Sequence, residues 1–143
     1  MVSEFVERFG LKIPLPDNWE FEETTDDEKF TASLFGSDTS FWTVSVFFSA
    51  PDPEHVIDQA LNALREEYDD LQSFPAEETV CDHETVAFDA EFVCLEWTTT
   101  AHLRCFRHGE VTLLIYYQGT DHELEESRSV LSAITQSLQL ANA

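Results

Sequence analysis

Residues 28–71 read EKFTASLFGSDTSFWTVSVFFSAPDPEHVIDQALNALREEYDDL, and the spacing of their apolar side chains changes once along the way. Apolar and polar residues first alternate with a period of two over Glu28–Phe35 and again over Phe41–Ser49, which is typical of half-buried strands. The segment between them begins with Gly36, a residue suited to turns. We therefore expect a β-hairpin here.

The second part of the stretch has the period of a helix. Asp52 is suited to the N-cap, Pro53 to the first helical position, and Glu54 to the positive end of the helix dipole. Apolar side chains then recur at helical spacing, at Ile57, Ala60, Leu61, Leu64, Tyr68 and Leu71. This pattern predicts an amphipathic helix that packs on the hairpin's sheet.

The flanking sequence adds strands on both sides. Leu11–Trp19 predicts a short strand interrupted by prolines, and Glu20–Glu28, with its many acids, predicts part strand and part exposed turn. Further strands are expected at 79–83, 85–98, 101–108 and 111–118. The capping-box spacing of Thr120 and Glu123 predicts the start of a second helix, whose apolar stripe is Leu124, Leu131, Ile134 and Leu138.

These elements predict one α+β domain over residues 1–143. Its antiparallel sheet has about six or seven strands and two principal helices. A three-residue turn at Thr98–Thr100 would place Trp97 opposite Ala101 and Glu96 opposite His102. In this register both faces of the sheet are substantially apolar. Either a helix covers each face, which we favour, or one face stays partly open as a binding groove.

An open groove would be lined by apolar side chains of the central strands. The candidates are Phe47, Val93, Leu95, Trp97, Leu114 and Tyr116. A partner bound there would be another protein, and a homodimer through the same face stays open as an alternative.

The composition narrows the function classes. Hydrophobic residues make up 43% of the 143, which is too many for a disordered chain. The net charge of −22 argues against nucleic acid and anionic membrane surfaces as partners, because both repel a negative protein. The start lacks a signal-peptide pattern, and three cysteines without a CxxC motif fit reduced thiols. The expected location is cytoplasmic.

No residue pattern predicts catalysis, a cofactor or a metal. Cys105 is three residues from His102 and three from His108, so on a strand its side chain points to the opposite face from both histidines, whereas zinc needs converging ligands. Cys81 and His83 share a face but supply only two ligands. Glu96, His102 and Arg104 form a polar cluster that is best interpreted as a cross-strand ion pair with a flanking imidazole. It is also the best candidate for contacting an anion.

The order of elements, with Leu11–Trp19 at the start, a Pro-started helix, and an aromatic strand after Gly109, resembles the PsbP-like superfamily. That superfamily includes an extrinsic photosystem II subunit, a Ran-binding transport factor and bacterial DcrB-like proteins. The resemblance implies an α/β/α sandwich that serves as a binding adaptor. Similar bacterial members are cytosolic chaperones of type VI secretion effectors, which shield apolar helices of a client on a concave sheet face.

We therefore expect a non-enzymatic protein-binding module, of chaperone or adaptor type. One alternative is an acidic inhibitor or immunity protein that blocks a basic partner through Glu20–Glu28 or the first helix. The other is a small-molecule pocket around Glu96, His102 and Arg104.

Overall fold

The computed structural model describes residues 4–36, 39–94, 96–121 and 123–141, and for 124–126 it describes the backbone. Its main sheet has seven strands, and every neighbouring pair is antiparallel. In spatial order these strands are β3 (Glu20–Thr25), β4 (Lys29–Phe35), β5 (Phe41–Phe47), β11 (Val111–Thr120), β10 (Trp97–His108), β9 (Val86–Cys94) and β6 (Gln72–Ala76). The predicted α+β class and number of strands are confirmed.

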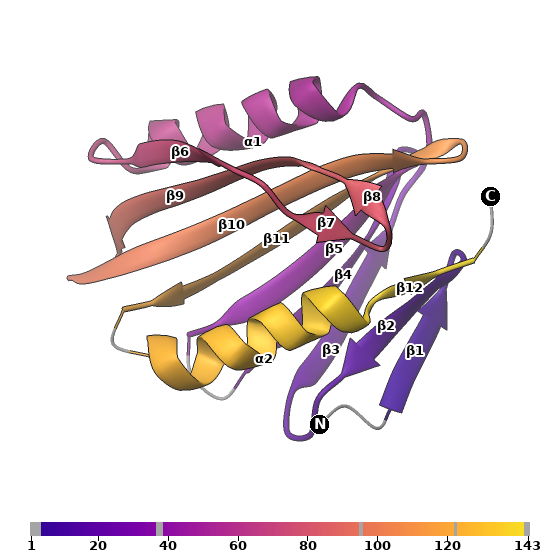
Figure 1. The fold of residues 1–143 in the computed structure, drawn as a ribbon, viewed down its shortest axis with the longest axis horizontal. Coiled ribbons are helices and arrows are strands. Elements are labelled where there is room, and N and C mark those ends of the chain that lie inside the picture. Colours follow the sequence, from indigo (N-terminus) through magenta and orange to yellow (C-terminus); the bar gives the residue numbers. More distant parts are fainter. Residues whose placement is uncertain (1–3, 37–38, 95, 122, 142–143) are drawn as a thin grey trace.

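Two helices lie on opposite sides of this sheet, as Figure 1 shows: α1 (Pro53–Glu67) and α2 (Leu124–Ser137). A small sheet of β1 (Glu4–Arg8), β2 (Leu11–Leu15) and β12 (Gln139–Leu140) lies beside α2. A short hairpin of β7 (Thr79–Val80) and β8 (His83–Glu84) completes the described elements. Neither helix in the described ranges is long and apolar enough to cross a membrane.

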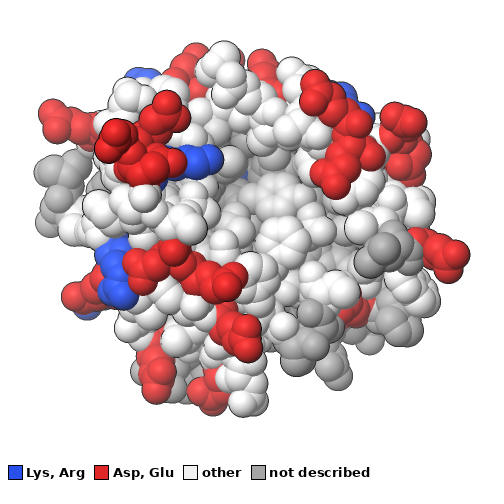
Figure 2. All heavy atoms as spheres, turned by 180° about the vertical axis from the view of Figure 1, so that it is seen from behind, with Lys and Arg blue, Asp and Glu red and all other residues white. Residues whose placement is uncertain are grey.

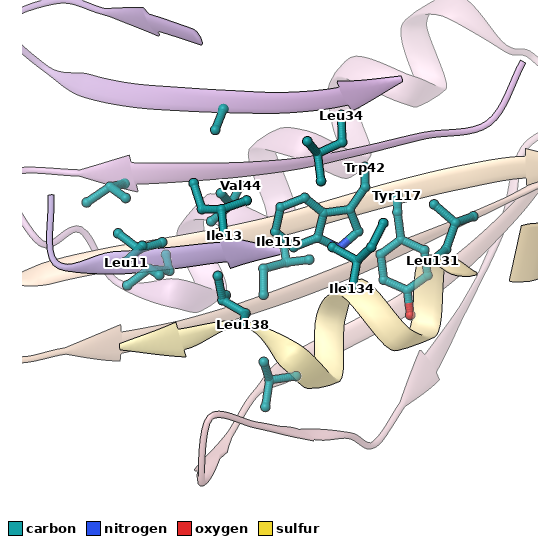
Figure 3. Packing of buried hydrophobic residues seen from close by; sticks show 14 of the residues in the cluster. Leu11, Ile13, Leu34, Trp42, Val44, Ile115, Tyr117, Leu131, Ile134 and Leu138 are labelled. Carbon is teal, nitrogen blue, oxygen red and sulfur yellow. The ribbon is translucent and has the colours of Figure 1, made fainter. Parts of the chain in front are cut away.

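The larger core lies between the sheet and the layer of α2 and β2 (Figure 3). The predicted alternation is confirmed here, because Trp42, Val44 and Val46 of β5 all point into this core and are almost completely buried. They pack with side chains from the covering layer, namely Leu11, Ile13, Leu131, Ile134 and Leu138. Burial of this apolar surface holds α2 and the small sheet on the main sheet.

The start of α1 is also confirmed. The Asp52 carboxylate accepts a hydrogen bond from the Glu54 N–H at 3.2 Å, and Pro53 occupies the first turn. The buried face of α1 (Val56, Ile57, Leu61) packs against a second core of β9, β10 and β11 residues. Tyr68 ends the helix, so Leu71, although it still packs on this core, lies beyond the helical segment.

Three strands were not predicted, the predicted strand at 79–83 is divided by a turn at Cys81 and Asp82, and α2 begins later than expected. β1, β6 and β12 are short or interrupted by proline, so their sequences lack a readable alternation. Helix α2 begins at Leu124, because Thr120 stays paired with Thr99 as the last residue of β11. The Glu123 carboxylate does accept a hydrogen bond from the Thr120 hydroxyl, at 2.7 Å, but Glu123 itself is the cap residue.

The predicted register of the β9–β10 hairpin is wrong. Trp97 lies opposite Cys94 and not opposite Ala101, which places the turn before Trp97. Glu96 takes the positive φ of the turn, 71°, whereas Thr98–Thr100 are β-strand residues. The physical reason is that β-branched threonines favour extended backbone. No Gly or Asn marks the true turn, so the sequence carried no signal for it.

Candidate functional site

Helix α1 covers only part of its side of the sheet. It packs mainly on β9, β10 and β11 and reaches only Phe47 at the end of β5, so in the described ranges most of β3, β4 and β5 has no helix over it on that side. We call this uncovered surface the open half-face. It consists of the outward side chains of β4 and β5 with the adjoining Tyr116 of β11, namely Thr31, Ser33, Phe35, Phe41, Thr43, Ser45, Phe47 and Tyr116. The two sequence alternatives therefore both hold in part: each face has a helix, and one face stays half open.

Aromatic rings run across the open half-face. Phe35 lies 6.3 Å from Phe41, and Phe41 stacks on Tyr116 at 5.8 Å between ring centroids. All three side chains are half-buried. The polar groups between the rings are small and partly satisfy each other, since the hydroxyls of Thr31 and Ser45 are 3.1 Å apart. The result is an aromatic surface with short hydroxyl side chains, which favours apolar contact with a partner.

This surface continues towards Trp97. A hollow of about 180 Å³ is lined by Trp97, Gln118 and neighbouring side chains, and Gln118 is the strand partner of Phe41. The Tyr116 hydroxyl donates to the Gln118 side-chain oxygen, which fixes both groups. Trp97 is 48% exposed, an unusual fraction for a large aromatic side chain. The open half-face and the Trp97 hollow together form one candidate site.

Acidic groups surround the open half-face. Figure 2 shows the uncharged, hollowed surface of this side of the molecule with Asp and Glu side chains around it. Glu20 and Glu22 of β3 lie opposite Phe35 and Ser33 and are exposed. Burial raises the pKa of Tyr116, and the charge of nearby Glu67 on α1 raises it further. The site therefore combines an apolar centre with a negative rim.

One cation lies within this acidic surrounding. The Lys29 ammonium lies 5.5 Å from the centre of the Phe47 ring. Lys29 of β4 and Phe47 of β5 are opposite one another in the sheet. A cation over an aromatic face is a favourable arrangement, and it covers part of the Phe47 ring.

The six residues predicted as a patch do not form one surface. Phe47, Leu114 and Tyr116 lie on the α1 side, partly packed against the core under that helix. Trp97 is on the same side at the far end of the sheet. Val93, 49% exposed, points to the opposite side from its neighbour Phe92, which is in the α1 core. Leu95 lies outside the described residues.

Two contributors to the open half-face, Phe35 and Phe41, were missed. On this second face of the hairpin, only Phe47 was predicted to bind a partner. The signal available was that this second face, at Phe35, Phe41 and Phe47, carries large aromatics where a solvated face would carry polar residues.

The predicted polar cluster is only partly correct. His102 and Arg104 do lie together, but their common partner is Asp89: His102 Nδ1 is 2.9 Å and Arg104 Nη1 is 2.8 Å from Asp89 Oδ1. Arg104 Nε also donates to Glu78 at 2.5 Å. Glu96 is exposed at the β9–β10 turn and is not part of this group. The error follows from the predicted register, which placed Glu96 opposite His102, whereas Asp89 lies opposite His102 in the structure.

The cluster around Arg104 is a satisfied ion network. Arg104 is only 5% exposed, and its guanidinium also donates to the carbonyls of Phe88 and Leu103. Burial opposes ionisation of Asp89, but hydrogen bonds from His102 and Arg104 outweigh it and hold its pKa below the usual value. Because Arg104 Nε and Nη1 already donate to acceptors of the same chain, this side chain is held inside the network and offers little to a bound anion.

Two further hollows lie on the α2 side. The larger, about 600 Å³, is between α2 and the turn after β2, with Phe5, Trp19 and Val130 among its walls. The other, about 350 Å³, lies between the β1–β2 turn and β12. In the described part of the chain, no group of three or more His, Cys, Asp or Glu side chains is placed to hold a metal ion.

Comparison with known proteins shows the fold and leaves the family open. No family model and no curated protein sequence matches the chain. Among solved structures, cyanobacterial PsbP from Synechocystis is similar with a TM-score of 0.61 at 8% identity, covering 92% of this chain and 86% of that one. LpqN, involved in cell envelope biogenesis of Mycobacterium tuberculosis, is similar with a TM-score of 0.54 at 10% identity, covering 92% and 83%.

A protein of unknown function from Pseudomonas aeruginosa is similar with a TM-score of 0.53 at 12% identity, covering 93% of both chains. Identities this low carry the fold and nothing finer. The PsbP-like architecture expected from the order of elements is confirmed at that level. The chain has the fold of the PsbP-like proteins.

Proposed function

We propose that this chain is a non-enzymatic binding module that holds an apolar segment of another protein on the open half-face, in the manner of a chaperone or adaptor. The observation that carries the proposal is the aromatic surface of β4 and β5, which faces away from the core and lies beside α1 without a helix over it. A surface of this kind in a protein of net charge −22 marks a site for a partner.

The charges around the site indicate what kind of segment fits. Glu20, Glu22 and Glu67 supply negative charge near the aromatic centre. A partner helix or strand with an apolar face would pack on the aromatic centre, and Lys or Arg side chains beside that face would pair with the acidic rim. A second copy of this chain is a poorer occupant, because it would bring another charge of −22 to the same interface.

The non-enzymatic part of the proposal is supported by the state of the polar residues. Arg104, Asp89 and His102 bind one another and lie on the α2 side, away from the open half-face. The hydroxyl-bearing side chains of the half-face have no acidic or basic side chain hydrogen-bonded to them among the contacts described for Thr31, Thr43 and Ser45. Such a surface is suited to contact, whereas general acid–base chemistry needs a positioned titratable group.

The test uses a defined probe. A fluorescent peptide of about 20 Leu and Ala residues with Lys at both ends is titrated with the protein, and anisotropy gives the dissociation constant. The double variant Phe35→Ser, Phe41→Ser should bind at least tenfold more weakly, since buried aromatic anchors contribute about 2 kcal/mol or more each. Phe74→Ser is the matched control, because Phe74 is 45% exposed on edge strand β6 and points to the other side of the sheet.

The outcomes separate the alternatives. Weaker binding in the half-face variant alone, with measurable binding of the wild type retained in high salt, supports the proposal. Unchanged binding in that variant refutes the proposal. If the further variant Phe5→Ser loses peptide binding instead, the site is the hollow beside α2. Binding that disappears in high salt, and that needs the acids of β3 but not the aromatics, refutes the apolar mode and favours the acidic inhibitor.

A further inference from the structure

Two histidines that are far apart in the sequence meet beside the β7–β8 hairpin. His83 belongs to β8, and His108 is the last residue of β10. His83 Nε2 lies 3.3 Å from His108 Nδ1, and the ring planes are inclined by 67°. The His83 ring also packs on Phe106, with 4.8 Å between ring centroids. Both imidazoles are half-buried, so their positions are fixed but solvent still reaches them.

The outer nitrogens of the two rings determine their tautomers. His83 Nδ1 is 2.8 Å from the Cys81 carbonyl oxygen, and His108 Nε2 is 2.7 Å from the Ala141 carbonyl oxygen. A carbonyl oxygen only accepts hydrogen bonds, so each of these ring nitrogens must carry its proton and donate. In the neutral imidazoles, the two nitrogens that face each other are then both unprotonated.

This arrangement needs a cation at the contact, because two nitrogen lone pairs 3.3 Å apart repel each other. We propose that the cation is a divalent transition-metal ion of the Zn²⁺ or Ni²⁺ class, bound by His83 Nε2 and His108 Nδ1. Two ligands of a tetrahedral ion, each about 2.0–2.1 Å from the metal, lie about 3.3–3.4 Å apart, which matches the observed separation. Imidazole nitrogen is a preferred ligand for these ions.

The surroundings of the pair also fit a metal. Metal-binding histidines usually donate their second N–H to a backbone carbonyl or a carboxylate, and both rings here donate to a carbonyl. The chain supplies two ligands, since no third His, Cys, Asp or Glu in the described ranges converges on them. Water would complete the coordination, as in an open site. The net charge of −22 raises the local concentration of cations.

The bound ion would link three segments. His83 holds it from the β7–β8 hairpin and His108 from the end of β10, while the carbonyl that orients His108 belongs to Ala141, directly after β12. Ala141 also donates its N–H to the Gly10 carbonyl at 2.8 Å. Metal binding should therefore stabilise the end of the small sheet as well as the hairpin.

The experiment is a calorimetric titration of the protein with Ni²⁺. Excess Mg²⁺ is present throughout to occupy the surface carboxylates. We expect one equivalent bound by the wild type and a Tm that rises with the logarithm of the Ni²⁺ concentration. His83→Gln and His108→Gln should each weaken binding at least tenfold. His55→Gln is the matched control, because His55 is exposed on α1, and it should bind as the wild type does.

A second measurement does not depend on any variant's folding. Paramagnetic Ni²⁺ should broaden the ring resonances of His83 and His108 in the wild type before those of His55. No bound equivalent in the wild type would overturn the proposal and leave a shared proton as the cation between the rings. Wild-type affinity in folded His83→Gln or His108→Gln, or broadening that begins at His55, would overturn it as well.

Discussion

The indole N–H of Trp42 on β5 donates a hydrogen bond to Thr135 Oγ1 on α2, with 2.9 Å between the two atoms. Both residues are completely buried, and the Thr135 hydroxyl passes the interaction on to the Leu131 carbonyl at 3.0 Å. In a layer whose other contacts are almost all apolar, this polar bond has a fixed geometry and sets the position of α2 along the sheet.

Thr135→Val should destabilise the protein by about 1–3 kcal/mol, because valine has nearly the shape of threonine but leaves the indole N–H buried without its acceptor. Urea unfolding followed by tryptophan fluorescence measures the change. Ser132→Val, at an exposed position on the same helix, is the control and should shift the free energy of unfolding by about 0.5 kcal/mol or less. Equal effects of the two substitutions would show that the Trp42 bond contributes nothing.

Arg104→Met should destabilise the fold by about 3 kcal/mol, since it removes the buried cation of the network and breaks its ion pairs with Asp89 and Glu78. The comparison is Lys12→Met, which removes an exposed cation 3.6 Å from Glu7 and should cost about 0.5 kcal/mol or less. Circular dichroism during urea unfolding reports both values. A similar small cost for each would mean that the Arg104 network is not stabilising.

Glu123 should make stability depend on acid pH. Burial opposes its ionisation, but hydrogen bonds from Thr39 and Thr120 prevail and lower the pKa from 4.5 to about 2. A carboxyl whose pKa is lower in the folded state stabilises the fold above the unfolded-state value of 4.5. That contribution is lost as the pH falls from about 4.5 through about 2.

The measurement is the free energy of unfolding of wild type and Glu123→Gln between pH 6 and pH 2.5. The difference between the two proteins should shrink as the pH falls. A constant difference over this range would show that ionised Glu123 is not the stabilising form.

The thiols of Cys81 and Cys105 should resist alkylation in the folded protein. Burial raises the pKa of Cys81 to about 11 and that of Cys105 to about 12, so almost no thiolate exists at pH 8. Iodoacetamide at pH 8, with sites counted by peptide mass spectrometry, should leave both unmodified in native protein and modify all three cysteines in urea. Fast native modification of Cys105 would contradict the packing of β10 under α1.

The sequence was most informative where a structure depends on neighbouring residues. The alternation of Trp42, Val44 and Val46 identified one face of β5, and the Asp52–Pro53 pair identified the first residue of α1. Both signals follow from local geometry: a strand alternates its side chains, and a helix start needs a capping acceptor. The order of such elements was enough to predict the fold class.

The site depended on contacts between distant residues and was predicted less well. Arg104 is bound by Glu78, 26 residues away, and His83 meets His108 across 25 residues. A turn before Trp97 in place of one at 98–100 changed every pair of opposite residues in the β9–β10 hairpin. The spacing of apolar residues in α1 predicts a buried helix face but does not tell which strands that face packs on. The uncovered half of the sheet could therefore not be predicted from it.

The pairing of β12 with β2 has a consequence for how the protein is made. Lys12 and Leu11 lie opposite Gln139 and Leu140, so strands from the two ends of the described chain are neighbours. A ribosome adds residues from the N-terminal side, and the β1–β2 hairpin must therefore wait for almost the whole chain before its third strand exists. Until then the inward side chains Leu11 and Ile13 lack part of their cover, so we expect this hairpin to expose apolar surface during synthesis.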